Sequence, residues 1–150
     1  MQASDIQIRS ASLSDLPVIR QLAAEIWPET YGPIQSAQQI AYMLDLFYSD
    51  QALKKDFQKP GYHFFILIAD GEAFGYAGVE QKEKGRWHVH KLYLSPKLQG
   101  KGLGRMLIAH VEQVAKENKA LELTLNVNRH NKALEFYKSN GYTILKEEDT

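Results

Sequence analysis

The sequence contains no cysteine. Without thiols the chain has no disulfide framework, no thiolate metal site and no cysteine nucleophile, and redox chemistry at sulfur is excluded. The histidine, aspartate and glutamate positions lack a metal-ligand spacing such as His-Glu-x-x-His, so no metal is expected. A Gly-x-Ser-x-Gly elbow is also absent, which leaves hydrolysis by a serine nucleophile without support.

The chain has no excess charge of either sign, because 18 Lys and Arg balance 18 Asp and Glu. A general nucleic-acid binder carries an excess of positive charge, which this chain lacks, so no nucleic-acid partner is expected. No stretch approaches the roughly 18 apolar residues that span a bilayer, and Met1–Arg9 lacks a long apolar core. We therefore expect no membrane association and a cytoplasmic location.

What the chain does have is the composition of a globular domain. Its 150 residues are 44% hydrophobic and 24% charged, with 10 Gly and 5 Pro. A chain of this length buries roughly two-thirds of the surface that its unfolded state exposes. We predict a single domain over residues 1–150.

Hydrophobic periodicity and turn residues predict the elements of the first part of the chain. They are a strand over Asp5–Ser10, a helix capped at Ser12 with Leu16, Ile19, Ala23 and Ile26 on its buried face, a proline-broken aromatic loop over Trp27–Pro33, and a helix capped at Ser36 with Ile40, Met43, Leu44 and Phe47 on its buried stripe. The segment Asp50–Lys59 is either a polar turn or a further helix.

The second part is predicted to form a meander followed by alternating helices and strands. Its elements are strands over His63–Ala69, Phe74–Glu80 and Arg86–Leu94, a helix carrying Leu103, Leu107, Val111 and Val114, a strand over Leu121–Val127, a helix over Asn131–Ser139, and a strand beginning in Tyr142–Leu145. The dipeptides Asp70-Gly71 and Lys84-Gly85 predict tight turns. The fold class is α/β (α+β) with the order βααβββαβαβ, and Leu121–Val127 is expected parallel to Arg86–Leu94.

A glycine-rich loop precedes the third predicted helix, with Gly100, Gly102 and Gly104 at alternate positions. Such a loop lets backbone N–H groups converge on an anion at the positive end of the helix dipole. Lys101 and Arg105 add cationic donors, so a phosphate is expected. The spacing fits neither a dinucleotide fingerprint nor a P-loop. The alternative is a strand-to-helix turn without a ligand.

The loop spacing Gln99-x-x-Gly102-x-Gly104 resembles the acetyl-CoA signature of the GNAT superfamily of N-acetyltransferases. Leu92-Tyr93-Leu94-x-Pro96 resembles the strand that precedes it, and Asn128-x-x-Asn131-x-Ala133-x-x-Phe136-Tyr137-x-x-x-Gly141-Tyr142 resembles the second motif of the family. The resemblance implies a mixed, mostly antiparallel twisted sheet with splayed central parallel strands, flanked by four helices. It also implies acetyl-CoA as the cosubstrate.

The resemblance further implies which residues contact CoA. The strand end Leu92, Tyr93 and Leu94 would lie along the pantetheine arm, with backbone groups of Leu92 and Leu94 pairing with it. The remaining expected contacts are Gln99, Gly100, Lys101, Gly102, Leu103, Gly104, Arg105, Asn131 and Tyr137. By the same resemblance, Tyr137 would protonate or hydrogen-bond the CoA sulfur, and the alternative is an ordinary amphipathic tyrosine.

Two histidines are candidates for the group that takes the proton of the amine. Many family members carry a glutamate on the strand before the loop, and counting back from Gln99 puts His88 in that position. A histidine with a pKa near 6.5 is neutral enough at cellular pH to accept a proton. His90 lies two residues on and is expected on the same face. The alternative is two half-exposed strand histidines with no catalytic role.

The acceptor is expected to be a small primary amine. Thr30-Tyr31, the Ser36–Gln39 cap and Tyr42-Met43 resemble a small-molecule branch similar to bacterial spermidine/spermine acetyltransferases, which implies a polyamine-like substrate. The alternatives are a protein or peptide N-acetyltransferase and a non-catalytic CoA-binding sensor module.

Three residues are candidates for contact with that amine. Trp27 and Tyr31 would wall a pocket by cation–π contact, or pack in the core. Glu80 would attract a cationic substrate, or carry a solvated charge.

The C-terminal edge of the sheet suggests an assembly. The family usually adds one more hairpin-paired strand, whereas this sequence stops at Lys146–Thr150. Because proteins tend to cover an unpaired edge, either the last strand closes the sheet alone or a homodimer covers it, and we expect the homodimer.

Overall fold

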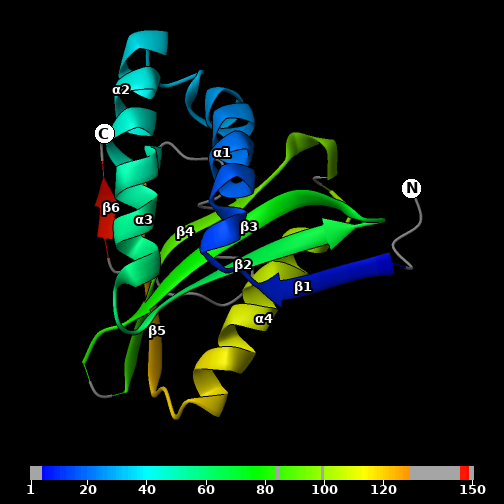
Figure 1. The fold of residues 1–150 in the computed structure, drawn as a ribbon, viewed down its shortest axis with the longest axis vertical. Coiled ribbons are helices and arrows are strands. Elements are labelled where there is room, and N and C mark those ends of the chain that lie inside the picture. The colour runs from blue at the N-terminus through cyan, green and yellow to red at the C-terminus, as the bar shows by residue number, and fades with distance from the viewer. Residues whose placement is uncertain (1–4, 84, 99, 129–145, 149–150) are drawn as a thin grey trace.

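The computed structural model describes residues 5–83, 85–98, 100–128 and 146–148. In these residues the strands form one sheet, and helices pack against it (Figure 1). The elements are β1 (Ile6–Ser10), η2 (Leu13–Asp15), α1 (Leu16–Tyr31), α2 (Ala37–Tyr48), α3 (Asp50–Gln58), β2 (Tyr62–Ala69), β3 (Glu72–Gln81), β4 (Arg86–Leu94), η3 (Pro96–Leu98), α4 (Leu103–Glu117), β5 (Glu122–Asn128) and β6 (Lys146–Glu148). The predicted helix Asn131–Ser139 and the segment Tyr142–Leu145 lie outside the described residues.

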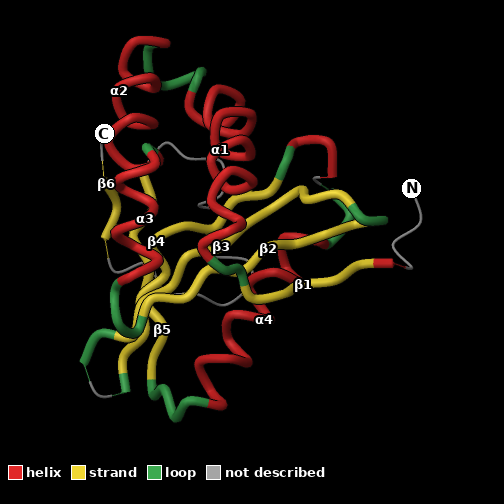
Figure 2. The backbone as a smooth tube through the Cα atoms, viewed as in Figure 1, coloured by secondary structure: helices red, strands yellow, loops and turns green. Residues whose placement is uncertain are grey.

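The strands lie side by side in chain order, from β1 to β6. Strands β1 to β4 pair antiparallel, whereas β4 pairs parallel to β5 and β5 parallel to β6. Figure 2 shows the strands between helices. The predicted mixed sheet, the bounds of Arg86–Leu94 and its parallel pairing with the strand after α4 are confirmed.

The sheet separates two hydrophobic cores because successive strand residues point to opposite faces. Phe64 of β2 packs with helices α1, α2 and α3, whereas its neighbour Phe65 packs with α4. Each core contains one tryptophan, Trp27 on the α1 side and Trp87 on the α4 side. The helices therefore form a layer on each face of the sheet.

The turn at Asp70-Gly71 has the predicted hairpin geometry. Asp70 has φ 50° and Gly71 has φ 83°. Two successive residues with positive φ match the right-handed twist of the flanking strands, and this is the reason for the Asp-Gly preference.

Helix α1 contradicts the prediction that the chain breaks at Trp27, since it continues through Pro28 to Tyr31. Pro28 in a helix costs about 3 kcal/mol. The side chains of Trp27 and Tyr31 in this part of the helix are only 4% and 6% exposed. Burying each of them contributes roughly 2–3 kcal/mol. The N–H of Gly32 also donates to the carbonyl of Pro28 at 2.9 Å, so hydrogen bonding resumes after the proline. Tertiary burial therefore outweighs the local break.

Other differences concern helix ends and faces. Asp50–Gln58 is a separate helix, because the Ser49 side chain accepts a hydrogen bond from the N–H of Ala52 and caps it. Phe47, predicted on a buried stripe, is 43% exposed, because α2 buries only Ile40 and Tyr48. Among the described residues, no helix combines the length and apolar character that crossing a bilayer requires.

Gly78 on β3 makes room for a side chain of the neighbouring strand β2. A Cβ at this position would lie 2.8 Å from the hydroxyl oxygen of Tyr62 and 3.2 Å from an edge carbon of Phe64. The absence of a side chain at Gly78 therefore lets the Tyr62 ring lie across the sheet.

We expect Gly78→Ala to lower the free energy of unfolding by about 1–3 kcal/mol, because the added methyl group overpacks this contact. Urea denaturation measures the change. The double variant with Tyr62→Phe removes the hydroxyl that the methyl group meets, so its cost should be smaller than the sum of the two single costs. Additive costs would contradict the contact.

Candidate active site

The loop before α4 has a backbone that requires glycine at two positions. Gly100 has φ 83° and Gly102 has φ 77°, in the left-handed region that side chains disfavour. A Cβ at either position would meet nothing within 4 Å, so open space lies in front of the loop. Gly104 differs from the other two, because it lies inside α4 and has no positive φ.

The N-terminus of α4 is suited to bind an anion. Gly102 is the N-cap and offers no side chain to the first-turn N–H groups of the helix, which lack intrahelical partners. Lys101 and Arg105 are exposed beside it, and the first turn contains no acidic residue. Leu103 is 2% exposed and anchors this end of the helix in the core. Open space, positive helix end and nearby cations together match what a phosphate requires.

Strand β4, which leads into this loop, contains a bulge at His90. Gly78 of β3 is opposite Lys91 and Val79 is opposite Val89, so His90 is an extra residue in the ladder. The described register between β4 and β5 runs from Arg86 only as far as Val89. The bulge therefore coincides with the end of the parallel pairing.

Glu80 of β3 is the centre of a buried charge cluster and is 5% exposed. Its Oε1 lies 2.8 Å from His90 Nε2 and 3.1 Å from Lys82 Nζ, and its Oε2 lies 2.9 Å from Lys59 Nζ. Burial raises the pKa of Glu80, but hydrogen bonds from Lys59, His90 and Lys82 outweigh burial and lower its pKa to about 2. The carboxylate is therefore ionised at neutral pH, with its charge compensated by two lysines and one of its oxygens also bonded to His90.

The two predicted histidines lie together but have different partners. Their ring centroids are 4.8 Å apart, which confirms that they share a face. His88 Nδ1 lies 2.7 Å from the hydroxyl oxygen of Thr124 on β5. Burial, followed by the charges of His90, Lys82 and Arg86, lowers the pKa of His88 to about 4. Burial also lowers the pKa of His90, against a hydrogen bond to Glu80 that raises it.

The predicted aromatic residues Trp27 and Tyr31 lie in the core on the α1 side. The hydroxyl groups of Tyr31 and Tyr93 are 2.8 Å apart, and the Trp27 ring centroid lies 4.7 Å from Tyr31 and 5.7 Å from Tyr93. Their burial matches the packed-core alternative. The cluster joins the end of α1 to the strand that leads into the glycine loop.

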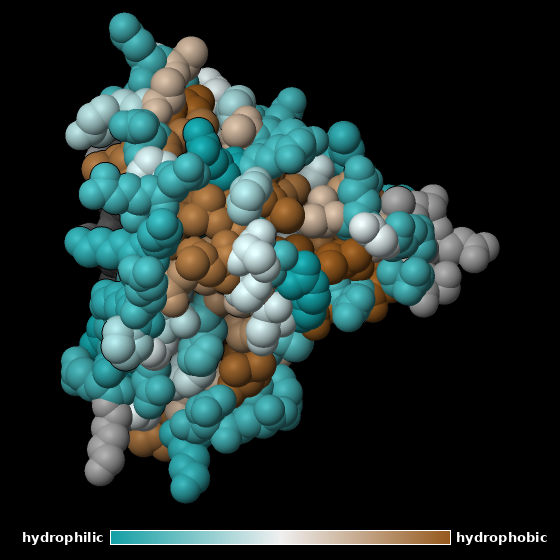
Figure 3. Space-filling model, viewed as in Figure 1, coloured by the Kyte–Doolittle hydropathy of each residue, from teal (hydrophilic) through white to brown (hydrophobic). Residues whose placement is uncertain are grey.

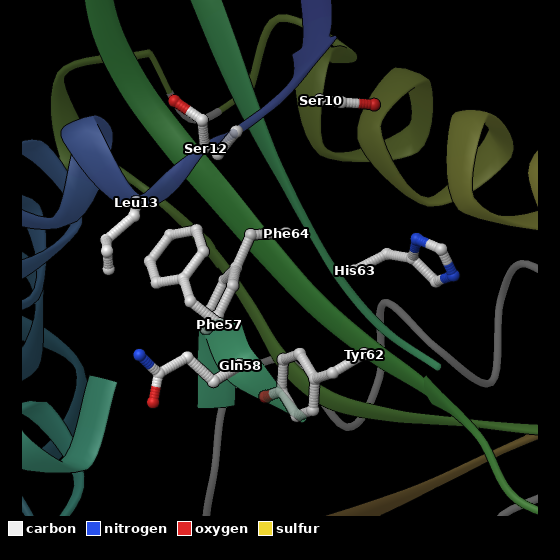
Figure 4. Close-up of a pocket in the computed structure, with 9 residues that line it drawn as sticks. Ser10, Ser12, Leu13, Phe57, Gln58, Tyr62, His63 and Phe64 are labelled. Carbon is white, nitrogen blue, oxygen red and sulfur yellow. The ribbon is translucent and has the colours of Figure 1, made fainter. Parts of the chain in front are cut away.

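A hollow of about 220 Å³ lies between the β1–η2 connection and the end of α3. Figure 3 shows apolar residues in the middle of this face, within a rim of hydrophilic residues. Phe57, Tyr62 and Phe64 line the hollow, whereas the His63 side chain points away from them (Figure 4). Tyr62 connects the hollow to the two histidines of β4, because its ring also stacks on the His90 ring, with the ring centroids 5.5 Å apart.

Comparison with known proteins identifies the family. A model of the GNAT acetyltransferase domain matches residues 33–150. The spermidine N(1)-acetyltransferase of Thermoplasma acidophilum is 31% identical over 151 residues, which cover 97% of this chain and 91% of that protein. The chain belongs to the GNAT acetyltransferase family.

Two further relatives agree with this membership. An N-acetyltransferase from the pepI 3′ region of Lactobacillus delbrueckii subsp. lactis is 29% identical over 95% of this chain and 87% of its own length. The crystal structure of the PaiA N-acetyltransferase from T. acidophilum in complex with coenzyme A has a TM-score of 0.87 and 28% identity, covering 97% of this chain and 92% of that chain. The protein is therefore an acetyltransferase that uses acetyl-CoA as the acetyl donor.

The described residues fit acetyl-CoA as a cosubstrate. CoA carries a pyrophosphate. Gly100 and Gly102, whose φ angles are positive, face open space at the N-terminus of α4, which has no side-chain cap. Gln99, Asn131 and Tyr137, which the family resemblance assigns to CoA, lie outside the described residues. Nothing in the described parts of the chain groups three or more potential histidine, aspartate or glutamate metal ligands.

Sequence analysis did not identify Lys91 as part of this region. Its ammonium nitrogen lies 3.3 Å from Asp56 Oδ2 and 3.2 Å from the Tyr62 hydroxyl, and 5.5 Å from the centre of the Tyr48 ring. Burial lowers the pKa of Lys91, and Asp56 partly offsets this. A lysine directly before the apolar strand end Leu92–Leu94 is a signal that could have found it. Thr124 had no such signal, because its contact with His88 depends on the strand register.

We expect Gly102→Val to weaken acetyl-CoA binding at least about tenfold, because a branched side chain strains the left-handed backbone and fills the space in front of the loop. Isothermal titration measures the affinity of variants that keep the circular dichroism of the parent. Gly71→Val is the matched control, since Gly71 also has a positive φ, 83°, and no atom within 4 Å of a Cβ, but it belongs to the β2–β3 hairpin and not to the glycine loop. Equal affinity in both variants would contradict the role of the loop.

Proposed function

We propose that the enzyme transfers the acetyl group of acetyl-CoA directly to a primary amine of a small molecule, with a polyamine as the first candidate. One observation carries the proposal: the strand that leads into the glycine loop also holds paired histidines beside an ionised glutamate. This arrangement puts candidate proton acceptors and an anion site on consecutive segments. Amine acetylation needs both a deprotonated nucleophile and a bound acyl donor.

Direct transfer agrees with the composition of the chain. The amine nitrogen attacks the thioester carbonyl, the new N–C bond forms and the C–S bond breaks. An acyl-enzyme route requires an activated nucleophile. The chain has no cysteine and no Gly-x-Ser-x-Gly elbow, so such a nucleophile has no support in the sequence.

The CoA contacts follow from the loop and the strand before it. The backbone of Gly100 to Gly104 binds the pyrophosphate, and Lys101 and Arg105 compensate its charge. Gln99 and Leu103 border this site, and Leu92, Tyr93 and Leu94 lie along the pantetheine arm. Asn131 and Tyr137 belong to the second motif, and Tyr137 delivers a proton to the departing thiolate.

A small cationic acceptor is supported by the relatives. The spermidine N(1)-acetyltransferase of T. acidophilum matches nearly the whole length of this chain. His88 and His90 are the candidates for taking a proton from the ammonium form of the acceptor. Glu80 supports this site through His90 rather than as an open carboxylate, because its two oxygens already contact lysines and His90. A homodimer and a cytoplasmic location stay predictions from the sequence.

We expect turnover of acetyl-CoA with spermidine, spermine and simple diamines to exceed turnover with peptides that carry a free N-terminus or lysine. Released CoA is measured with a thiol reagent, and the cysteine-free chain adds no thiol background. Preference for peptides would favour a protein N-acetyltransferase. Acetyl-CoA binding without turnover of any amine would favour a CoA-binding sensor.

We expect Tyr137→Phe to lower kcat by about 10²–10⁴-fold, because the hydroxyl supplies the proton for the leaving thiolate. The affinity for acetyl-CoA should change little, since the substitution removes one oxygen and little volume. Steady-state kinetics and isothermal titration separate the two effects. Unchanged kcat would make Tyr137 a packing residue.

A further inference from the structure

We propose that Glu80 is a positioning residue that makes His90, rather than His88, the group that takes the proton from the amine. The proposal rests on the proposed amine acetylation and adds the identity of the base and the residue that orients it. It follows from the location of the two histidines in β4 and from the contacts of each ring.

The location of His90 distinguishes it from His88. His88 lies within the paired part of β4, opposite Thr124 of β5. His90 is the bulged residue and the first one beyond the last described pair with β5, which is at Val89. Bulges direct side chains away from the regular ladder and are frequent next to active sites. His90 therefore lies where the two parallel strands cease to pair, on the side toward the glycine loop.

Glu80 and Tyr62 fix the His90 ring. The carboxylate lies 2.8 Å from Nε2, and the Tyr62 ring stacks on the imidazole with an interplanar angle of 8°. An ionised carboxylate only accepts hydrogen bonds, so Nε2 must carry the proton in the neutral ring. The second nitrogen, Nδ1, then keeps its lone pair and can accept a proton from the substrate. A carboxylate that orients a histidine in this way is the usual device for selecting one tautomer.

Burial and then the nearby lysines lower the pKa of His90, while hydrogen bonds from lysines hold the pKa of Glu80 low. Lys59, after α3, and Lys82, after β3, both contact the carboxylate of Glu80. Lys91 follows His90 on β4, and its charge also lowers the pKa of His90.

Two rings also contact His90, and a second carboxylate, Asp56, contacts the lysine that follows it. His88 lies beside it on β4 and Tyr62 lies over it from β2. Asp56 of α3 contacts Lys91, so its charge is compensated by that lysine and not by the histidine. The single anion that contacts His90 among the described residues is Glu80.

His88 is the less suitable proton acceptor. Its Nδ1 lies 2.7 Å from the Thr124 hydroxyl oxygen, and burial, followed by the neighbouring cations, lowers its pKa. A base that stays neutral down to a pKa of about 4 holds a proton weakly at cellular pH. We therefore assign His88 no proton transfer. Its neutral ring packs beside His90 and does not repel His90 when that ring takes up a proton.

The pH dependence of kcat/KM separates these roles. His90 accepts a proton only when its ring is neutral, so kcat/KM should fall as the pH drops through the pKa of His90. Glu80 raises this pKa, and Glu80→Gln should move the acid limb to lower pH while lowering kcat about tenfold through loss of orientation. Lys82→Gln removes a cation that lowers the pKa, so the limb should move to higher pH. Lys82 is partly exposed, and this variant should therefore fold even if Glu80→Gln does not.

Two matched variants serve as controls. Glu83→Gln removes an exposed carboxylate three residues along the chain, whose side chain is 80% exposed, and should leave the limb unchanged. Thr124→Val removes the partner of His88 and should also leave the limb unchanged. A limb that moves with Thr124→Val but not with the Glu80 and Lys82 variants would overturn the proposal and assign the base to His88.

Long-range proton–nitrogen NMR tests the tautomer without any substrate. We expect the Nε2–H form of His90 in the parent protein at neutral pH and a mixture of tautomers in Glu80→Gln. A parent ring protonated on Nδ1 would overturn the proposal. Because this readout needs no acceptor, it stands apart from the amine panel, whose failure would instead overturn the proposed function.

Discussion

Strand β4 stops pairing with one of its two neighbouring strands at a single residue, and the rest of the site depends on that change. Along β3 the strand pairs through to Leu94, but along β5 the described register stops at Val89. The extra residue at His90 bends the strand where the parallel ladder ends. The same bend directs β4 toward η3 and the glycine loop. Without the bulge, β4 would continue to pair with β5 beyond Val89, and the two strands would not separate at this position.

Buried charge is the second constraint on this region. Taking a carboxylate out of water costs several kcal/mol unless partners compensate it. Glu80 has Lys59, Lys82 and His90 as partners, while Lys91, on the same face, has Asp56 and aromatic rings. Glu80 and Lys91 therefore each have ion-pair partners of their own. Glu80 can therefore orient the ring of His90, while Lys91 links α3 to the sheet through Asp56.

The elements that sequence predicted well are those set by local chemistry. The Lys84-Gly85 turn signal predicted where Arg86–Leu94 begins, and the Asp70-Gly71 dipeptide predicted its hairpin, because positive φ selects such residues. The glycine loop was found for the same reason. The continuation of α1 through Pro28 was missed, since burial of aromatic side chains from distant elements decides it.

The pairing of the site residues was less accessible to sequence. Spacing indicated that His88 and His90 share a face, and the rings do lie together. The contact of His90 with Glu80 depends on the register between β3 and β4, which a bulge shifts by one residue. No local pattern reports such a shift. The same holds for Thr124, which reaches His88 only across the parallel pair.

The two cores divided by the sheet each enclose one of the two tryptophans of the chain. Trp27 is surrounded by the tyrosines of the α1 side, whereas Trp87 stacks on His63 beneath α4. Replacing either indole leaves a single tryptophan, and its emission, excited selectively above the absorption of the eight tyrosines, reports one layer. The protein thus contains its own optical labels for asking whether the helices that cover the two faces come apart together or in sequence.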